Sequence, residues 1–423
     1  MVQTLEEVLD ARQESINLKK IDDFKIKNCN IEGNTGELKE FVQYFKDRLL
    51  KLRKIIQGNL FQQGLITVQN SKEFLDRREV VIAGLVNSKS TTKNGNIRIE
   101  LEDETSKITC IVSKDSEAFK KTDELVEDEV IGLRGGISNS LFIVKEIIYP
   151  EVPMRTWQAL QDEDEYVAFL SDLHFGSKYC LKNKLKTAIE FLNGNIQEEI
   201  GKKIKTVLIC GDVVDGIGIF PEQEKELEEK NIYNQFKEFE DFVLQINEDK
   251  RIVIIPGNHD PVRLAEPQPT IPVKFLPNLA NRKNVVMGTN PCTVEIKGKK
   301  ILMYHGRSLF SISTQIPKIQ EPFKNPDKIA EIWLRKRHLN PIYGFNPIVP
   351  EPEDELVIKD LPDVIHFGDI HHNAASVYRG IRIINSGTFQ DTTELQKKGG
   401  LVPTPGIIPI LNLKNGSIKQ VIV

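Results

Sequence analysis

The chain has 423 residues, of which 39% are hydrophobic and 28% are charged, a composition typical of a globular protein with two or three domains. Its formal net charge of −4 argues against a stand-alone nucleic-acid binder, unless bound cations or a partner chain supply positive charge. We expect a cytoplasmic protein without a membrane partner, a disulfide framework or a thiolate zinc site, because long apolar runs, a secretory signal and paired cysteines are all missing from the sequence.

The first region, residues 1–72, is predicted to be a helical segment. Residues 41–57, FVQYFKDRLLKLRKIIQ, place Phe41, Phe45 and Leu49 near helical spacing, with basic residues between them. Two interpretations stay open for this helix. It packs on a neighbouring element, as charged helices usually do, or its basic face contacts DNA.

Residues 73–150 change to short strands, near 78–90, 96–105, 107–114, 128–138 and 140–150. Five strands with a helical interruption between the third and the fourth predict a small OB-type barrel. Such barrels bind single strands or proteins. Stacking on single strands needs exposed aromatic rings, and the strand segment from about residue 75 to 150 has only Phe119, Phe142 and Tyr149, so we favour protein contact.

Residues 151–423 are predicted to form an α/β domain that follows a linker at 150–158. Apolar strands alternate there with helices expected at 183–200 and 223–248, a pattern typical of layered α/β folds. The final residues, 406–423, contain Asn415-Gly416 and predict an antiparallel hairpin.

Five apolar strands in this domain each end in side chains that can bind a metal ion, namely Asp, Asn or His. They are YVAFLSDLH (166–174), KTVLICGDVVD (205–215), RIVIIPGNHD (251–260), KKILMYHG (299–306) and PDVIHFGDIHH (362–372). Sites in α/β sheets form beyond the carboxyl ends of strands, so we expect these five ends to converge. The candidate residues are Asp172, His174, Asp212, Asn258, His259, His305 and His371.

Carboxylate, imidazole and amide ligands without a thiol are typical of manganese, iron or zinc sites. The glycines Gly211, Gly257 and Gly368 precede candidate residues, where the backbone must let a ligand approach closely. Of the other histidines, we expect His366 to be structural and His338, within LRKRH, to lie on the surface.

The ordered motifs DLH, GDVVD, GNHD, HG and GDIH closely resemble those of the calcineurin-like metallophosphoesterase superfamily. The resemblance implies an α/β sandwich with two divalent metal ions. One motif departs from the family, whose last motif reads Gly-His-x-His, whereas this chain has Gly368-Asp369-Ile370-His371. Asp369 therefore stands where the family has a ligand of the second metal, and the occupancy of that metal is left open.

A closer resemblance is carried by MYHGRS (303–308), LRKRHLNPIYGFNPIV (334–349) and NSGTFQDTTELQKKGGLVPTPG (385–406). These segments look like the small subunit of the archaeal family D DNA polymerase, over residues 75–423. That family implies a 3′–5′ exonuclease acting on single-stranded or mismatched DNA 3′ ends, with manganese as the metal. It also implies a large catalytic subunit as partner and a nucleoid-associated location. Contact with the sliding clamp through that partner is left open.

The superfamily resemblance also implies a role for each candidate. Asp172, His174 and His371 would hold the first metal, Asp212 would bridge the two, and Asn258, His305 and Asp369 would hold the second. Manganese is the expected ion, with Fe²⁺, Zn²⁺ and Mg²⁺ as alternatives. His259 would be the catalytic group, Asp215 and Asp260 would orient histidines or waters, and Arg307 would clamp a phosphate or pair with a site carboxylate.

Two other functions compete with the exonuclease. A scaffold that holds the polymerase subunit, with a weak or inactive site, is favoured by Asp369. A stand-alone phosphatase or nuclease is disfavoured by the fused barrel and by the family-like segments. The basic run RKRH (335–338) could line a DNA path, lie on the surface or contact another subunit.

Overall fold

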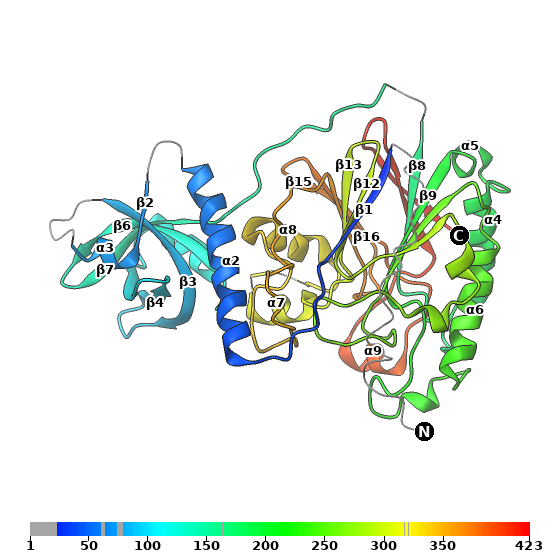
Figure 1. The fold of residues 1–423 in the computed structure, drawn as a ribbon, viewed down its shortest axis with the longest axis horizontal. Coiled ribbons are helices and arrows are strands. Elements are labelled where there is room, and N and C mark those ends of the chain that lie inside the picture. The colour runs from blue at the N-terminus through cyan, green and yellow to red at the C-terminus, as the bar shows by residue number, and fades with distance from the viewer. Residues whose placement is uncertain (1–22, 61–63, 74–78, 162–163, 317, 320) are drawn as a thin grey trace.

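The computed structural model describes residues 23–60, 64–73, 79–161, 164–316, 318–319 and 321–423. Three six-stranded sheets organise this part of the chain. One sheet closes into a barrel, and the other two pack face to face as a sandwich that is covered by helices (Figure 1). Within the described residues, no helix is both long and apolar enough to cross a membrane.

The barrel confirms the predicted OB fold. Its strands run antiparallel except that β2 pairs with β3 and β5 pairs with β7 in parallel, and β3 pairs with both β4 and β6 to close the barrel. The predicted helical interruption between β5 and β6 is a 3₁₀ helix. The elements are β2 (Leu65–Ile66), α3 (Val68–Ser71), β3 (Val80–Thr91), β4 (Ile97–Glu102), β5 (Lys107–Val112), η1 (Glu117–Glu124), β6 (Val130–Ser138) and β7 (Leu141–Ile148).

The first sheet of the sandwich has the order β11-β10-β9-β8-β17-β18, and its strands β8 to β11 are parallel. Both of its faces are buried, which explains the nearly continuous apolar runs in the sequence. Successive residues of β8 alternate between the two cores, with Val167 and Phe169 facing the other sheet and Ala168 and Leu170 facing helices. The strands are β8 (Tyr166–Leu170), β9 (Ile204–Cys210), β10 (Arg251–Ile255), β11 (Val285–Met287), β17 (Ile407–Asn412) and β18 (Ile418–Ile422).

The second sheet has the order β1-β12-β13-β14-β16-β15. Its edge strand β1 corrects the prediction that the first region is helical, since Phe24 to Asn28 pair antiparallel with β12. FKIKN is too short to show a clear period, but Phe24 and Ile26 pack into the core between the sheets. Residues 1–22 of the predicted helical segment lie outside the described residues. The strands are β1 (Phe24–Asn28), β12 (Cys292–Ile296), β13 (Lys299–Met303), β14 (Val364–Phe367), β15 (Ala374–Tyr378) and β16 (Ile381–Asn385).

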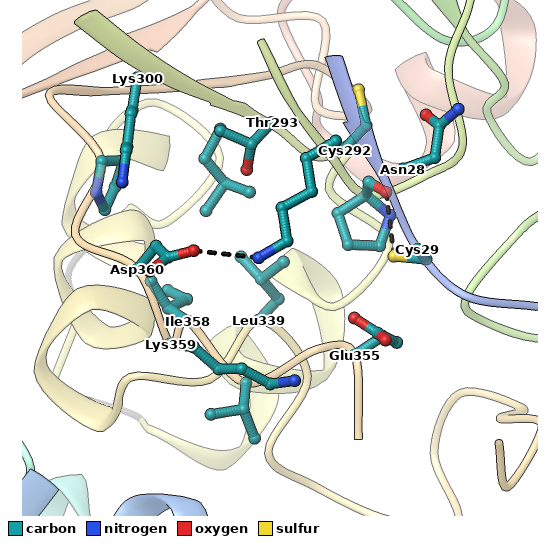
Figure 2. Close-up of a pocket in the computed structure, with 15 residues that line it drawn as sticks. Asn28, Cys29, Cys292, Thr293, Lys300, Leu339, Glu355, Ile358, Lys359 and Asp360 are labelled. Carbon is teal, nitrogen blue, oxygen red and sulfur yellow. Dashed lines mark hydrogen bonds and ion pairs between the residues drawn. The ribbon is translucent and has the colours of Figure 1, made fainter. Parts of the chain in front are cut away.

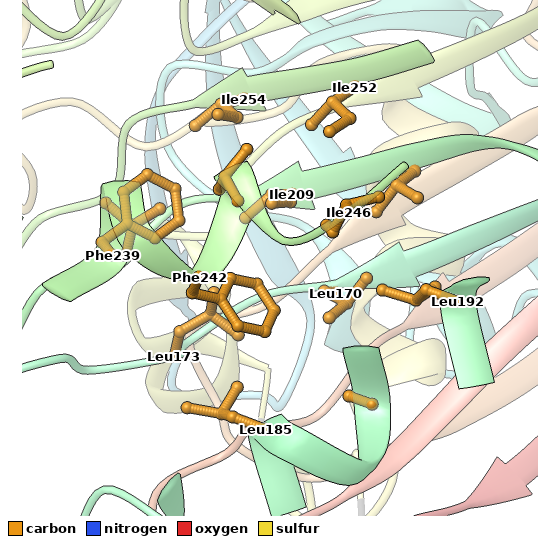
Figure 3. Packing of buried hydrophobic residues seen from close by; sticks show 14 of the residues in the cluster. Leu170, Leu173, Leu185, Leu192, Ile209, Phe239, Phe242, Ile246, Ile252 and Ile254 are labelled. Atoms are coloured by element: carbon orange, nitrogen blue, oxygen red, sulfur yellow. The ribbon is translucent and has the colours of Figure 1, made fainter. Parts of the chain in front are cut away.

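Helices cover the outer face of each sheet. Figure 3 shows Phe239 and Phe242 of α6, with Leu185 and Leu192 of α4, packed on isoleucines of β9 and β10. These helices are shorter than predicted, because left-handed Gly194 ends α4 and the 223–231 segment forms only one short 3₁₀ turn. The helices are α4 (Lys182–Asn193), α5 (Glu198–Gly201), η2 (Gln223–Lys225), α6 (Ile232–Leu244), η3 (Val273–Phe275), η4 (Leu279–Asn281), α7 (Leu309–Gln315), α8 (Pro326–Lys336) and α9 (Glu394–Gly399).

Helix α2 (Leu38–Asn59) stands between the barrel and the sandwich (Figure 1). Its apolar face packs on the barrel, and its Arg48 is buried against Asp354 of the sandwich. The prediction that this helix packs on a neighbouring element is therefore confirmed for its buried face.

The basic run at 335–338 faces inward, and the prediction that His338 lies on the surface is wrong. Lys336 pairs with Glu129 of the barrel, and His338 is bonded to Asp354. Charge runs usually face solvent, but these acidic partners come from other parts of the chain.

Candidate metal centre

The candidate residues converge where the carboxyl ends of strands from both sheets meet. Asp172, Asp212 and Asn258 follow β8, β9 and β10, while His305 and Asp369 follow β13 and β14. All of these side chains, with His174, His259 and His371, lie in loops at this one edge of the sandwich. The sequence pattern therefore brings together the residues that it singled out.

The local backbone of the centre is strained. Five of its non-glycine residues have left-handed φ angles: Asp172 (52°), His174 (49°), Asp212 (51°), Asp369 (66°) and His371 (60°). L-residues rarely adopt this conformation, and strain of this kind gathers at functional sites. The strand ends turn so sharply that the side chains that follow them point back into a common centre.

Two glycines make the close packing of the ligands possible. A Cβ atom at Gly257 would lie 2.2 Å from Asp212 Oδ1, and one at Gly368 would lie 2.3 Å from Asp172 Oδ2. Both positions therefore exclude any side chain. The groups that approach these glycines are carboxylates of the candidate residues, and the close approach of a metal or phosphate expected from the sequence stays a prediction.

One group of donors is formed by Asp172, His174 and His371, whose ligand atoms all lie within 4.8 Å of one another. The Nε2 atoms of the two histidines are 3.0 Å apart, and His371 Nε2 is 3.3 Å from Asp172 Oδ1. Two imidazoles and a carboxylate at this spacing match three of the donors of a divalent metal site.

A second group is centred on Asp212. Its Oδ2 lies 3.3 Å from His305 Nε2, 3.9 Å from His174 Nε2 and 4.0 Å from His259 Nε2. Asp369 Oδ1 is 3.7 Å from His305 Nε2, on the side of the centre where the family has its second metal. Asp212 thus lies between the two groups, as a bridging ligand must.

The hydrogen bonds of the centre leave donors unused. Asp172 Oδ1, Asn258 Oδ1 and His305 Nε2 are buried and have no hydrogen-bond partner among the described residues. Buried polar atoms are nearly always bonded in proteins, so three unpartnered atoms on the candidate residues are an observation in favour of a ligand site. Oxygen and nitrogen donors in this set fit divalent cations, and the residues present therefore fit the two predicted ions.

Contacts behind the histidines set which ring nitrogen faces the centre. His305 Nδ1 lies 2.8 Å from the Cys210 carbonyl and His174 Nδ1 lies 3.0 Å from Asp215 Oδ1, so each of these nitrogens donates and leaves Nε2 free to ligate. His371 differs, because the Gln396 amide nitrogen lies 2.8 Å from its Nδ1. Its Nε2 then carries the ring proton, so binding of a cation there would require that proton to move to Nδ1 and the Gln396 amide to turn its oxygen toward it.

The ionisation of the centre is set by the facing acids and imidazoles. Burial alone would raise the pKa of Asp212, but His305 and His259 hold that pKa well below its usual range. Burial likewise opposes the charged form of His305, yet Asp212 raises the pKa of this imidazole well above its usual value. The carboxylates are therefore balanced by imidazolium protons, which metal ions could replace.

The two predicted orienting acids do different work. Asp215 holds His174 and accepts hydrogen bonds from the side-chain amides of Gln223 and Gln390. Asp260 touches no histidine. Its carboxyl group accepts backbone N–H bonds from Val213 and Gly257, and burial next to Asp212 raises its pKa to about 7. Asp260 therefore ties the loops of the Asp212 and Asn258 motifs together.

Arg307 is exposed, and its guanidinium makes no ion pair or side-chain hydrogen bond with any described residue. Burial raises the pKa of Asp369, while the charge of Arg307 works against that rise, so the two groups are neighbours. Of its two predicted roles, a salt bridge with a site carboxylate is absent from the described contacts, and the phosphate clamp stays a prediction.

Comparison with known proteins places this site in a family. Residues 167–376 match the family described as the B subunit of DNA polymerase alpha/epsilon, and residues 80–152 match an OB-fold nucleic acid binding domain. The DNA polymerase II small subunit of Methanocaldococcus jannaschii is 40% identical over 387 residues, 90% of this chain and 64% of that protein. The one from Methanothermobacter thermautotrophicus is 38% identical over 389 residues, 90% of this chain and 79% of that protein. The chain belongs to the DNA polymerase II small-subunit family.

Membership confirms the resemblance to the small subunit of the archaeal family D polymerase. A third relative, from Archaeoglobus fulgidus, is 38% identical over 381 residues, 89% of this chain and 75% of that protein. The chain spans less than two thirds of the length of the Methanocaldococcus jannaschii small subunit. The share of the relative that is matched differs from one small subunit to the next, 64% in Methanocaldococcus jannaschii and 79% in Methanothermobacter thermautotrophicus.

Three glutamines of this small subunit support the centre and were missed by sequence reasoning. Gln223 and Gln390 fix Asp215, and Gln396 of α9 contacts His371. Glutamine is neither a common metal ligand nor titratable, so no local pattern marks it. The only signal was that Gln390 and Gln396 lie in the family-like segment 385–406.

A separate hollow lies under the edge strand β1 (Figure 2). It is lined by Lys27 and Cys29 on one side and by residues 357–360 on the other, and none of the metal-centre candidates borders it. Lys27 Nζ spans it to Asp360 Oδ2 at 3.0 Å. This ion pair helps to hold β1 in place, and the hollow is unrelated to the site.

Proposed function

We propose that this chain carries a metal-dependent 3′–5′ exonuclease that hydrolyses phosphodiester bonds at DNA 3′ ends. The proposal rests on one observation above the others, the buried unpartnered donors Asp172 Oδ1, Asn258 Oδ1 and His305 Nε2 around the central carboxylate of Asp212. Two divalent ions, with manganese as the first candidate, would supply Lewis-acid activation of the phosphate and of a water nucleophile.

The chain itself supplies the proton for the leaving group. His259 Nδ1 lies 2.7 Å from the Asp215 carbonyl, which turns Nε2 toward the centre. Burial opposes its charge, but Asp212 and Asp215 raise the pKa of His259 above its usual value. The imidazole can therefore hold a proton at Nε2 and give it to the departing 3′-oxygen of the upstream nucleotide.

The partner follows from the names of the relatives, which are small subunits of DNA polymerase II. We infer a large catalytic subunit as partner, with DNA replication in the cytoplasm of an archaeal cell as the setting. The large subunit would supply most of the grip on DNA and any contact with the sliding clamp. This assignment agrees with the chain's net charge of −4, because an acidic chain by itself attracts the DNA phosphates only weakly.

A scaffold role is the second candidate, and Asp369 favours it. A carboxylate replaces a neutral imidazole beside Asp212, which adds negative charge to the second metal position. The position of Asp369, near His305 and with its backbone N–H donated to Asp172, still lets its carboxylate serve as a ligand.

The test is the release of nucleotides from a 5′-labelled DNA with an unpaired 3′ end, in manganese, by the chain alone and with its large subunit. We expect His259→Ala to slow release by about 10²–10⁴-fold, since it removes the general acid. The matched control is His372→Ala, because His372 contacts only the Val402 carbonyl nearby and should be dispensable. If the unsubstituted protein releases no nucleotide in either form, the enzyme proposal is wrong and the scaffold role remains.

A further inference from the structure

An exposed aromatic cluster is built around α7, the helix that follows the His305 motif in the chain. Phe310 is 51% exposed and Phe345 is 44% exposed, which is unusual for neighbouring phenyl rings. The rings of Phe310 and Phe323 are 6.1 Å apart and nearly parallel, with 16° between their planes. Phe345 lies 6.1 Å from Phe310 on another side. Together they offer aromatic faces to a ligand rather than to the core.

The cluster is tied to the metal centre through Arg307. Phe310 lies on α7, five residues after His305, and consecutive Cα atoms are about 3.8 Å apart, so its Cα lies within roughly 19 Å of that of His305. Phe345 precedes Asn346, whose Nδ2 is 3.5 Å from the Arg307 carbonyl and 3.3 Å from Ser311 Oγ. Asn346 therefore ties the loop that carries Phe345 to the backbone of Arg307, and Phe310 follows Arg307 by three residues.

The base of the cluster is rigid. Leu309 and Ile312 of α7 are buried in the core beneath the second sheet. Trp333 Nε1 lies 2.9 Å from Ser308 Oγ, and that hydroxyl is itself bonded to the Leu339 carbonyl. The start of α7 is thus fixed from below, and the exposed rings are held outward.

Charge distinguishes a nucleic-acid ligand from a protein at this surface. The guanidinium of Arg307 is exposed and makes no ion pair with any described residue. A cation beside stacked aromatic rings is the usual surface for single-stranded nucleic acid, where bases stack and phosphates meet the charge. The described residues of the barrel offer no such surface, because Phe142 and Tyr149 are buried and Phe119 packs against the barrel core.

We propose that Phe310 and Phe345 form a stacking platform for the bases just upstream of the 3′ end, with Arg307 on a phosphate between the platform and the metal centre. The inference rests on the proposed exonuclease, for which it names substrate-positioning residues. Bases in a duplex are covered by their neighbours and paired with the other strand. The platform therefore selects unpaired 3′ ends.

The test measures binding separately from hydrolysis. The full chain, alone and with its large subunit, is titrated in EDTA with 5′-fluorescein (dT)₁₂, and fluorescence anisotropy gives the Kd. Replacing both rings in F310A/F345A should weaken binding by about tenfold or more, because each base–aromatic stack contributes substantially. F310Y/F345Y keeps the ring faces and should bind as the unsubstituted chain does.

A matched strand with abasic sites at its last three positions sharpens the test. The unsubstituted chain should bind this strand about tenfold more weakly than (dT)₁₂, whereas F310A/F345A should bind both equally. The control is Tyr233→Ala, which removes an aromatic ring 54% exposed on α6 and should leave both Kd values unchanged. Unchanged binding of (dT)₁₂ by F310A/F345A would overturn the platform. So would a loss of large-subunit assembly in that variant without loss of DNA binding, which would mark the cluster as a protein-docking surface.

Hydrolysis of bis(p-nitrophenyl) phosphate in manganese separates this proposal from the exonuclease. This small diester has no base, and F310A/F345A should hydrolyse it at the rate of the unsubstituted chain. Absence of hydrolysis of both the diester and DNA, with ring-dependent strand binding intact, would refute the exonuclease and support the platform. Hydrolysis of both with ring-independent binding would refute the platform alone.

Discussion

Two regions of this chain bury several charged side chains, and they differ in whether those groups have partners. At the contact between barrel, α2 and sandwich, Asp354 receives hydrogen bonds from Arg48 Nε at 2.7 Å, Tyr44 Oη at 2.8 Å and His338 Nε2 at 2.9 Å. Nearby, Lys336 pairs with Glu129 and also donates to the Glu124 carbonyl. The charged groups of this network have protein partners.

The metal centre has the opposite character. It gathers at least as many acids and imidazoles, yet Asp172 Oδ1, Asn258 Oδ1 and His305 Nε2 have no hydrogen-bond partner among the described residues. The comparison teaches that burial of charge does not mark a site. Unpartnered donor atoms within a group of acids and imidazoles do distinguish this centre from the paired network, although single unpartnered buried atoms such as Thr206 Oγ1 and Ser376 Oγ also occur elsewhere among the described residues.

The largest expected effect on stability is in the paired network. Asp354→Ala should lower the free energy of unfolding by about 3–5 kcal/mol, because Arg48 stays buried and charged without its carboxylate. Urea unfolding followed by circular dichroism measures the loss. The metal-free Asp212→Asn variant is the comparison, and its loss should be smaller, because the buried His305 that loses its carboxylate can give up its proton whereas Arg48 cannot. Equal losses in the two variants would remove the distinction between the regions.

Metal ions should stabilise the other region. A cation at 100 times its Kd should add about 2.7 kcal/mol to the free energy of unfolding, since it binds only the folded chain. Manganese should therefore raise the Tm of the unsubstituted protein, and EDTA should reverse the rise. Asp212→Asn should abolish most of the shift because it removes the bridging carboxylate. If manganese leaves the Tm unchanged, the metal assignment is contradicted, and no activity assay is needed to show it.

The paired network also predicts a pH dependence. Burial and the neighbouring charge of Arg48 lower the pKa of His338 to about 4. Its unfolded pKa is near 6.5, so the unfolded chain binds more protons as the pH falls between these values, and stability is lost. The loss attributable to His338 should be roughly 2 kcal/mol between pH 7 and pH 5.

The measurement is urea unfolding at both pH values, with His338→Gln as the comparison. The variant should lose about 2 kcal/mol less over this interval. Asp354 does not contribute in this window. Burial would raise its pKa, but His338 and Arg48 hold the pKa well below its usual range, so its contribution is lost only at lower pH. Identical pH profiles would show that His338 stays uncharged in both states or charged in both.

The smallest expected effect concerns the departure from the family motif. Asp369→His restores the usual ligand beside His305 and should keep or raise nuclease activity, with a change below about tenfold. Initial rates over a manganese series give both the activity and the apparent metal affinity. A large fall in rate at saturating manganese would show that the carboxylate has a role of its own.

The convergence of the candidate residues could be predicted from the sequence because its signal is local, while their roles stay predictions. Each ligand sits within a few residues of a buried strand end, and Asp172, Asp212 and His305 can be read from three short motifs. The barrel was also predictable, since its strands alternate and their turns are short. Both inferences need only neighbours in the chain.

What could not be predicted depends on contacts between distant residues. His338 looked exposed within a basic run, but Asp354 and Arg48 bury it across the contact between α2 and the sandwich. The strand at Phe24–Asn28 is defined by its pairing with β12, more than 260 residues away. Gln396 contacts His371 only because α9 folds back over the centre. None of these contacts produces a hydrophobic period or a local motif from which it could have been predicted.

The left-handed backbone at the centre has an evolutionary consequence. Strain of this kind costs on the order of 1–3 kcal/mol at each position, and glycine would relieve it. At Asp172, His174, Asp212, Asp369 and His371, drift under selection for folding alone would therefore favour glycine. A chain that no longer needed these side chains for catalysis would gain folding stability with each exchange to glycine. This one carries ligand-type side chains at all five positions, a pattern that favours continued selection on the chemistry of the centre.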